Sequence, residues 1–380
     1  MSTSAIDSTV SKISGPDELV QAIPYLLGFH ASDSVVLVGL ADGVVVVTAR
    51  LDLVDAAGQG VLDRTLRAMR RGGAESFVTV IYGEAPDADA YVLPHDEIIY
   101  DLIDAADDCD ADLTEAVLVA DRRWWSYLCA ERDCCPPEGH PVYDDCAFAA
   151  EATFAGIVVE RDREALARSL DPAPEDERRR LSQRIALAEA EGTQLVLTGR
   201  YETRQRSAKR AMFSAARRFD RDAKLGVVSE LSDDDLVGFV VTLREIAVRD
   251  PLWMAIDDGR VDGRALWLDL ARRAPSPYDA APMFLHGWAS WRAGNGALAG
   301  MAAERAISSD PDYSAADLLL GALSAAIDPR RFPKLRAPRA RGARRLADRG
   351  LGDGELADGE LGDTHEDVVA DESAEGDARC

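Results

Sequence analysis

The strongest constraint on the fold is a pair of valine-rich runs, residues 34–41 and 44–51, which are separated by Asp42 and Gly43. An Asp-Gly pair tolerates the positive φ angles of a tight hairpin turn, so the two runs are expected to pair as antiparallel strands. Neither run alternates apolar with polar residues, and such continuous apolarity is typical of a sheet that is covered on both faces. The sequence therefore predicts a hairpin at the centre of a sheet, with helices packed on each side.

A short helix is predicted just before this hairpin. Ser14 and Asp17 have the spacing of a helix N-cap, in which the serine oxygen accepts from a first-turn amide and the carboxylate favours the positive helix end. Pro24 has no amide to donate and disfavours helical angles at the residue before it, so the helix should break or restart there. Gly28 can adopt the left-handed conformation that ends a helix.

Strand patterns and helix patterns alternate through the rest of the N-terminal half. The predicted strands are residues 76–82, 114–120 and an edge strand at 122–128, and the predicted helices are residues 60–71, 97–106, 147–156 and 163–170. Strands that are connected through helices indicate an α/β layer architecture. We therefore expect an α/β domain over residues 13–172, with a mixed sheet of about five strands around the central hairpin.

The C-terminal half is predicted to be helical. Residues 175–191 and 201–224 have charged helical patterns and are expected to form a connector over residues 173–228. Ser232 is a predicted N-cap, and helices are expected to follow it through an all-α domain at residues 229–329.

Part of this helical domain has the spacing of a known repeat. Gly287, Ala299, Ala306 and Pro311 lie at the offsets of a tetratricopeptide-like helical hairpin, and Gly321 follows Gly287 after one 34-residue period. A single repeat cannot bury its own apolar face. We therefore expect this hairpin to pack on the preceding helices.

Both ends of the chain are predicted to be disordered. Residues 1–12 are small and polar, without periodicity. Residues 330–349 are rich in arginine and proline, and residues 350–378 are rich in aspartate, glutamate and glycine. Low apolar content and blocks of like charge predict a disordered tail over residues 330–380, basic at first and then acidic.

The charge of the chain limits its partners. The formal net charge of −25 over 380 residues argues against general affinity for nucleic acid or for anionic membranes. No signal-like segment and no apolar run long enough to span a bilayer is present, so we expect a cytoplasmic protein. Six cysteines in a chain of this length do not suggest a disulfide scaffold.

Three separated segments carry a resemblance to a known family. They are "PYLLGFHASDSVVLVGL" at residues 24–40, "WWSYLCAERDCCPPEGHPV" at residues 124–142 and "LREIAVRDPLWMAI" at residues 243–256. In this order they resemble an actinobacterial family catalogued as domain of unknown function 4192, over most of residues 13–329. The resemblance implies no activity, cofactor or catalytic residue.

One loop gathers potential metal ligands. Cys129, Cys134, Cys135 and His140 offer thiolate and imidazole, which are the donors that zinc prefers. Against a zinc site, adjacent cysteines cannot easily both turn toward one tetrahedral ion, and no second cysteine pair follows. A disulfide between Cys129 and either neighbouring cysteine is a second interpretation, and buried structural thiols are the preferred one. We therefore expect no cofactor.

The basic helix at residues 200–224 is a candidate contact for an acidic partner or RNA. Charges at this density more often make a solvated helix face. Four tryptophans are a candidate groove lining, although aromatic residues in helical hairpins more often form core. They are Trp253, Trp267, Trp288 and Trp291.

His30, Asp33 and Ser34 invite comparison with a catalytic triad. They lie together on one expected loop, with no strand-to-helix turn that would present a nucleophile and no separate orienting base. Capping of a helix or strand explains the serine and the aspartate better.

Taken together, these patterns favour a non-catalytic interaction or regulatory module that binds a protein partner through its helical domain. Phosphate loops, dinucleotide glycine motifs, zinc-protease helices and calcium loops are absent. The alternative is a small-molecule hydrolase or transferase with a site at the edge of the α/β sheet. A pocket of converging titratable groups would favour the enzyme, and an apolar helical groove would favour the binding module.

Overall fold

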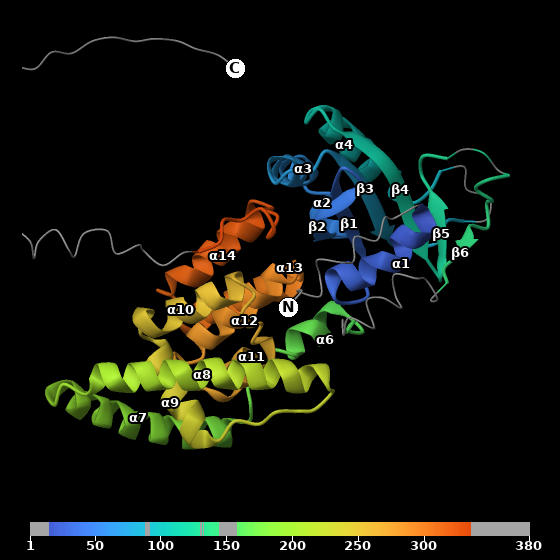
Figure 1. Cartoon of the computed structure of the whole chain (residues 1–380). Helices are drawn as coiled ribbons and strands as arrows, with labels where there is room; N and C mark the ends of the chain where they lie inside the picture. Colours follow the sequence, from blue (N-terminus) through green and yellow to red (C-terminus); the bar gives the residue numbers. More distant parts are fainter. Residues whose placement is uncertain (1–14, 88–91, 130, 132, 144–157, 336–380) are drawn as a thin grey trace, which may run out of the picture. The chain divides into compact units, whose positions relative to one another are not determined.

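A computed structural model describes residues 15–87, 92–129, 131, 133–143 and 158–335 (Figure 1). The predicted helix at residues 147–156, the predicted N-cap at Ser14 and the predicted disorder of residues 1–12 lie outside the described residues. So does the predicted tail from residue 336 onward. No helix in the described ranges is long and apolar enough to cross a bilayer.

Helices and strands alternate in the N-terminal part, and helices alone make up the C-terminal part. The N-terminal elements are α1 (Pro16–Leu27), β1 (Ser34–Ala41), β2 (Val44–Asp52), α2 (Leu53–Ala56), α3 (Val61–Arg71), β3 (Ser76–Tyr82), α4 (Asp96–Asp107), β4 (Asp112–Ala120), β5 (Arg123–Ser126), β6 (His140–Pro141) and α6 (Arg163–Arg168). The helical elements are α7 (Glu175–Leu197), α8 (Tyr201–Lys224), α9 (Asp233–Leu243), α10 (Ile246–Asp257), α11 (Arg264–Arg273), α12 (Ala280–Arg292), α13 (Gly296–Ser309) and α14 (Ser314–Ser324). The predicted order of an α/β part before a helical part is confirmed.

The six strands form one mixed sheet in the order β2-β1-β3-β4-β5-β6. β3 and β4 are parallel and are connected through α4, whereas all other neighbours are antiparallel. The sheet has one strand more than expected, because His140 and Pro141 pair with β5 after the cysteine loop. The predicted mixed sheet is therefore confirmed.

The hairpin lies at one end of the sheet rather than at its centre, so its predicted position was wrong. β1 pairs on both sides, with β2 and with β3, and Val35 to Val38 are fully buried. β2 is an edge strand, and most of its side chains are half-buried. Continuous apolarity shows that a strand is covered by other layers, but it does not show how many strands lie beside it.

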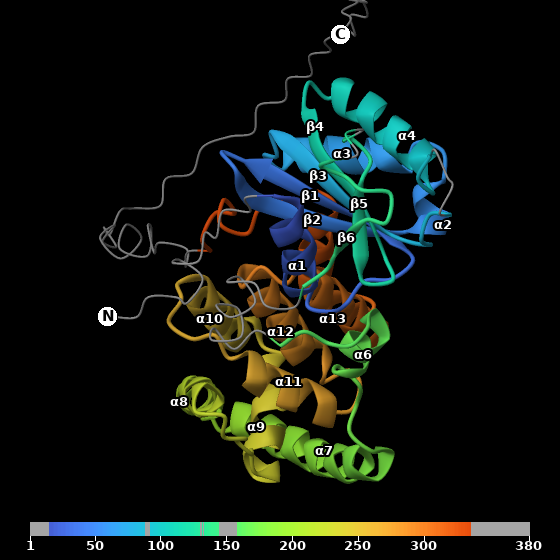
Figure 2. The same cartoon turned by 90° about the vertical axis from the view of Figure 1, so that its right-hand side faces the viewer.

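Two apolar cores cover the two faces of β1. Figure 2 shows α3 and α4 on one side of the sheet and α1 on the other. On one face, Val35 and Leu37 pack with the helices α3 and α4. On the other face, Val36 and Val38 pack with α1, and Leu298 of α13 completes this second core together with its neighbours Ala297 and Met301. The prediction of helices on each side of the hairpin is confirmed.

Helix α1 differs from its prediction at Pro24. It has Gly15 as its N-cap, without a side-chain cap. It runs through Pro24 and ends at Gly28, whose φ of 83° is left-handed as expected. The predicted break at Pro24 was wrong because Ile23 and Leu27, on either side of the proline, are buried against the sheet. This packing offsets the one helical hydrogen bond that proline cannot donate.

The helices α7 to α14 share one core. Leu181 of α7 and Met212 of α8 are fully buried in it, so the two helices predicted as a connector contribute to the packing of the helical part. Ser232 caps α9 as predicted, because its Oγ accepts from the backbone amide of Asp235 at 3.2 Å. Helices α12 and α13 approach closely at Gly287, where an added Cβ would lie 3.0 Å from the Cβ of Ala302. The tetratricopeptide-like character of this pair stays a prediction.

Residues 330–335, which were expected to begin the disordered tail, pack on the helical part. The ring of Phe332 lies 5.5 Å from the ring of Trp288 and 5.3 Å from that of Trp291, measured between centroids. The backbone amide of Leu335 donates to Asp257 at 2.9 Å. The ordered part of the chain therefore extends at least to Leu335.

Candidate functional site

The cysteine loop, residues 127–139, begins directly after β5 and is held there by one serine. The Oγ of Ser126 accepts from the backbone amides of Leu128 and Cys129, at 3.2 Å each. The same hydroxyl donates to a carboxylate oxygen of Glu115 on β4, also at 3.2 Å. These bonds fix the backbone at Cys129 to the sheet.

The far end of the cysteine loop is tied back to the same strand. The indole Nε1 of Trp125 donates to the carbonyl of Pro137 at 2.9 Å, and Arg123 donates to the carbonyls of Glu138 and Gly139. Gly139 has a φ of 71°, and a Cβ at this position would lie 2.4 Å from the Trp125 ring. The loop therefore needs glycine here both for its backbone angle and for its packing.

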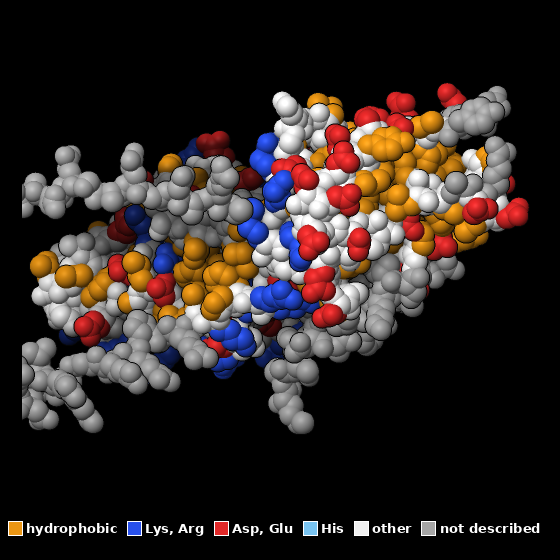
Figure 3. Space-filling model, turned by 90° about the horizontal axis from the view of Figure 1, so that it is seen from above, with side chains coloured by type: hydrophobic (Ala, Val, Ile, Leu, Met, Phe, Trp, Pro, Cys, Tyr) orange, Lys and Arg blue, Asp and Glu red, His pale blue; other side chains and the backbone are white. Residues whose placement is uncertain are grey.

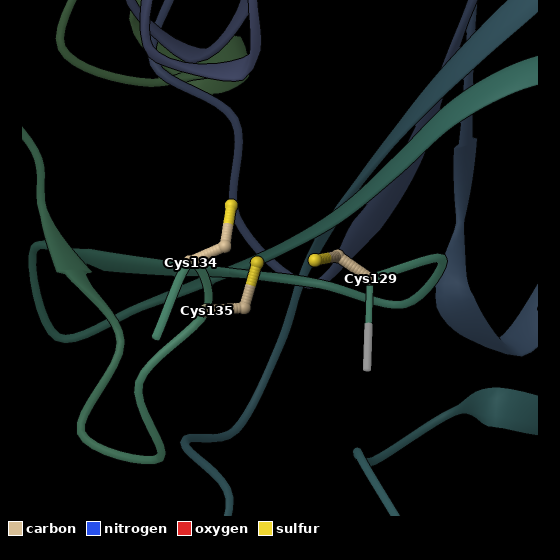
Figure 4. A group of neighbouring side chains, drawn as sticks. All are labelled: Cys129, Cys134 and Cys135. Atoms are coloured by element: carbon tan, nitrogen blue, oxygen red, sulfur yellow. The ribbon is translucent and has the colours of Figure 1, made fainter. Parts of the chain in front are cut away.

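A tight turn between these two ends brings three sulfur atoms together. The carbonyl of Glu131 accepts from the backbone amides of both Cys134 and Cys135, at 3.0 Å and 2.6 Å. The Sγ atoms of Cys129, Cys134 and Cys135 all lie within 4.8 Å of one another (Figure 4). This turn places the sulfur atoms of both adjacent cysteines near that of Cys129. Whether both can turn toward one tetrahedral ion stays the open point of the prediction.

His140, the fourth predicted ligand, does not join the three cysteines. Its ring stacks on Trp124 at 4.3 Å between centroids, and its Nε2 lies 2.8 Å from the carbonyl oxygen of Cys134. The imidazole therefore holds the turn from the backbone side. Among the described residues, the group of potential ligands consists of the three thiols alone.

The thiols are accessible and differ in acidity. Cys134 is exposed, while Cys129 and Cys135 are half-buried, so the interpretation as buried structural thiols does not hold for Cys134. A hydrogen bond with the Cys135 side chain is the main cause that lowers the pKa of Cys129. Burial, followed by the same hydrogen bond, raises the pKa of Cys135 to about 12. Cys129 therefore becomes a thiolate more readily than Cys135.

The four tryptophans of the helical part form core rather than a groove. All are buried, and Trp288 packs against both Trp253 and Trp291 with its ring centroid 4.9 Å from each. The indole of Trp288 donates to the buried carboxylate of Asp257 at 2.7 Å. The core interpretation of these residues is confirmed.

The residues compared with a catalytic triad are not gathered around an accessible serine. Ser34 is fully buried at the start of β1, whereas His30 and Asp33 are exposed on the preceding loop. The backbone carbonyl of Asp33 accepts from the amide of Leu53 at 3.0 Å, which ties the loop to the end of β2. We therefore interpret these residues as structural.

An arginine groove lies along α8. It is open, has a volume of about 680 Å³, and is lined by Arg210, Phe213, Ser214, Arg217, Arg218, Arg221 and Arg260. The six residues from α8 follow one face of the helix, because they recur at three- and four-residue steps. Arg260 comes from the segment after α10 and closes the groove from a different part of the chain.

The positive charge of the arginine groove is only partly neutralised. Arg221 pairs with Asp222 at 3.5 Å, and Arg260 pairs with Asp258 at 3.1 Å. Arg210 and Arg217 have no ion-pair partner in the part of the chain that the structure describes. The groove therefore offers at least two guanidinium groups to a ligand.

The family model described as "Domain of unknown function (DUF4192)" matches residues 16–330. The match covers both the cysteine loop and the arginine groove. No curated protein and no solved structure matches the chain.

Proposed function

The chain belongs to the DUF4192 family, a domain of unknown function, and from its geometry we propose that it is a non-catalytic module that binds an acidic protein segment in the arginine groove of α8. The observation that carries this proposal is the pair of arginines, Arg210 and Arg217, that stand in the groove without an acidic partner among the described residues. The proposed partner is another protein, and the proposed location is the cytoplasm.

The chemistry of the groove suits binding better than catalysis. Its lining has five guanidinium groups, one phenyl ring and one hydroxyl. A guanidinium stays protonated at physiological pH and cannot serve as a general base. Its planar fork binds carboxylates through two parallel hydrogen bonds, which makes it a specific receptor for acidic side chains.

The dimensions of the groove suit a short extended peptide. Arg210 and Arg221 are separated by eleven positions on α8, which corresponds to about 16 Å at the rise of an α-helix. An extended chain covers this distance with about five residues. Phe213 is half-buried and offers an apolar contact in the middle of this path.

The charge around the groove favours an acidic peptide over a nucleic acid. The formal net charge of −25 repels a long phosphate chain more strongly than a short segment with a few carboxylates, and Asp222 and Asp258 lie directly beside the groove arginines. Charge is also unevenly distributed elsewhere: on the face in Figure 3, basic side chains gather in a band next to acidic ones. A short segment with a few carboxylates fits a local basic site, whereas a continuous polyanion meets these acidic neighbours.

The proposal is tested with a fluorescent twelve-residue peptide of alternating Glu and Gly, whose binding is followed by fluorescence anisotropy at low and at physiological salt. We expect the double variant Arg210→Glu/Arg217→Glu to weaken binding at least tenfold, because two attractive charges become repulsive. The matched control is Arg71→Glu on α3, which is exposed and lies outside the groove. A peptide with Gln in place of Glu should not bind.

Two results would contradict the proposal. In the first, the Glu peptide binds the double variant as tightly as it binds the wild-type chain. In the second, a twelve-nucleotide single-stranded DNA binds more tightly than the peptide and loses this binding in the double variant, which would identify the groove as a nucleic-acid site.

A further inference from the structure

We propose that Cys129, Cys134 and Cys135 bind one thiophilic divalent cation, with zinc as the physiological choice. The site is independent of the arginine groove, since the two share no residue. The observation behind the proposal is the convergence of three sulfur atoms on an accessible, tethered loop.

The spacing of the sulfur atoms suits a shared ion. When three atoms lie within 4.8 Å of one another, a point exists that is no more than about 2.8 Å from each of them. A zinc–thiolate bond is about 2.3 Å long, and a tetrahedral site places its sulfur atoms about 3.8 Å apart, so any two of the three have to approach by at most about 1 Å. Rotation of an exposed cysteine side chain such as Cys134 provides a movement of this size.

The backbone around the cluster is already held in place. Ser126 fixes the amide of Cys129, and the carbonyl of Glu131 fixes the amides of Cys134 and Cys135. His140 holds the carbonyl of Cys134. Because these bonds join groups of the protein itself, they order the loop backbone, and less of the binding free energy is lost to ordering.

Three sulfur ligands leave one position of a tetrahedral ion open. His140 is stacked on Trp124 and does not belong to the thiol group, so the fourth ligand is a water molecule or a group from a partner. Structural zinc sites have four protein ligands, whereas sites with three protein ligands keep an exchangeable position. The cysteine loop therefore fits a site whose occupancy or fourth ligand can change.

Binding requires the three thiols to lose their protons to solvent, so the affinity for the ion should fall as the pH is lowered. The ion carries two positive charges and the three thiolates carry three negative charges. The loaded site has a net charge of −1. Because one side of the loop is exposed, this charge stays in contact with water.

The experiment uses the full chain after reduction and removal of metal, first titrated with Co²⁺ and then with Zn²⁺. We expect one ion per chain and an intense near-ultraviolet sulfur-to-cobalt charge-transfer band that zinc abolishes. Each single variant, Cys129→Ser, Cys134→Ser or Cys135→Ser, should weaken binding at least tenfold. The matched control is Cys109→Ser, since Cys109 is a free, half-buried cysteine outside the cluster. His140→Ala should keep the charge-transfer band.

Several results would overturn the inference. In one, the reduced wild-type chain takes up no Co²⁺ and no Zn²⁺, which would leave the cluster as a set of free or disulfide-forming thiols. Alternatively, the Cys109→Ser variant loses as much affinity as the cluster variants, or the His140→Ala variant loses the charge-transfer band while the cysteine variants retain it. A failed peptide-binding experiment has no bearing on these readouts, because the groove arginines are not changed.

Discussion

Burial strongly affects the ionisation of His286 on α12. The side chain is buried, and its Nδ1 donates to the backbone carbonyl of Arg264 at 3.0 Å. Burial lowers its pKa to about 4, although the hydrogen bond to the carbonyl acts in the opposite direction. Of the two nearby charged groups, Arg264 lowers the pKa further and Asp262 raises it. The folded protein therefore keeps this histidine neutral under conditions in which an unfolded chain protonates it.

This difference predicts a pH dependence of stability. The unfolded histidine has a pKa of about 6.5, so below that pH the unfolded state binds a proton that the folded state does not. The stabilisation is complete above pH 6.5 and is lost as the pH falls from 6.5 toward 4. Between pH 7 and pH 5, we expect His286 to account for a loss of about 2 kcal/mol in the free energy of unfolding.

Urea unfolding of the wild-type chain and of His286→Gln at both pH values measures this contribution. The glutamine variant retains a donor at this position but does not titrate, so its stability should change less between the two pH values. An equal change in the two proteins would show that other groups are responsible.

At the level of elements, the two strands of the hairpin have similar sequences but different environments. Both are rich in valine, and the Asp42-Gly43 turn joins them as predicted. β1 has a hydrogen-bonded neighbour on each side, and β2 lies at the edge. Local sequence determines the turn and the extended conformation, whereas the choice of the third strand depends on β3, which lies more than thirty residues away.

A pair of charge substitutions should reveal this difference. Val36→Asp places an unpaired carboxylate on β1 at a fully buried position, so it should lower the free energy of unfolding by about 3 kcal/mol or more. Val44→Asp on β2, where the side chain is half-buried, should cost clearly less. Chemical denaturation of both variants gives the two values. Equal losses would mean that the edge strand is as enclosed as β1.

The difference between local sequence and long-range packing also explains which parts of the candidate sites the sequence could predict. The types and spacing of Cys129, Cys134 and Cys135 indicated a possible ligand set. Their convergence depends on the Glu131 carbonyl, whose two accepted hydrogen bonds have no sequence pattern of their own. The basic face of α8 was visible as a charged helical pattern. Arg260 joins it only through tertiary packing, so the groove itself could not be predicted.

At the level of the whole molecule, the end of the described chain contributes to the helical core. Phe332 lies against Trp288 and Trp291, and the amide of Leu335 satisfies one oxygen of the buried Asp257. Composition alone placed these residues in the basic tail, because two arginines precede Phe332 and a lysine follows it. A single aromatic side chain among charged residues is too weak a signal to predict such a contact.

Two truncations separate the packed residues from the rest of the tail. A chain that ends after Leu335 should keep its melting temperature within a few degrees of the full chain, because the residues removed have low apolar content. A chain that ends after Pro329 also loses Phe332 and the hydrogen bond to Asp257, so its melting temperature should fall by roughly 5–10 °C. Calorimetry of the three chains tests both statements. Identical values for the two truncated chains would show that Phe332 and Leu335 contribute little.

The apolar core between the sheet and the helices α1 and α13 has a consequence for the synthesis of this protein. Leu298 and Met301 of α13 pack against this core and help to cover β1. β1 ends at Ala41, so α13 is synthesised long after the strand. A ribosome that adds 5–20 residues per second needs roughly 10–50 s to reach α13 after finishing that strand. Throughout this interval part of a valine-rich surface stays uncovered on the nascent chain. The sheet can therefore complete its apolar packing only after α13 has been synthesised.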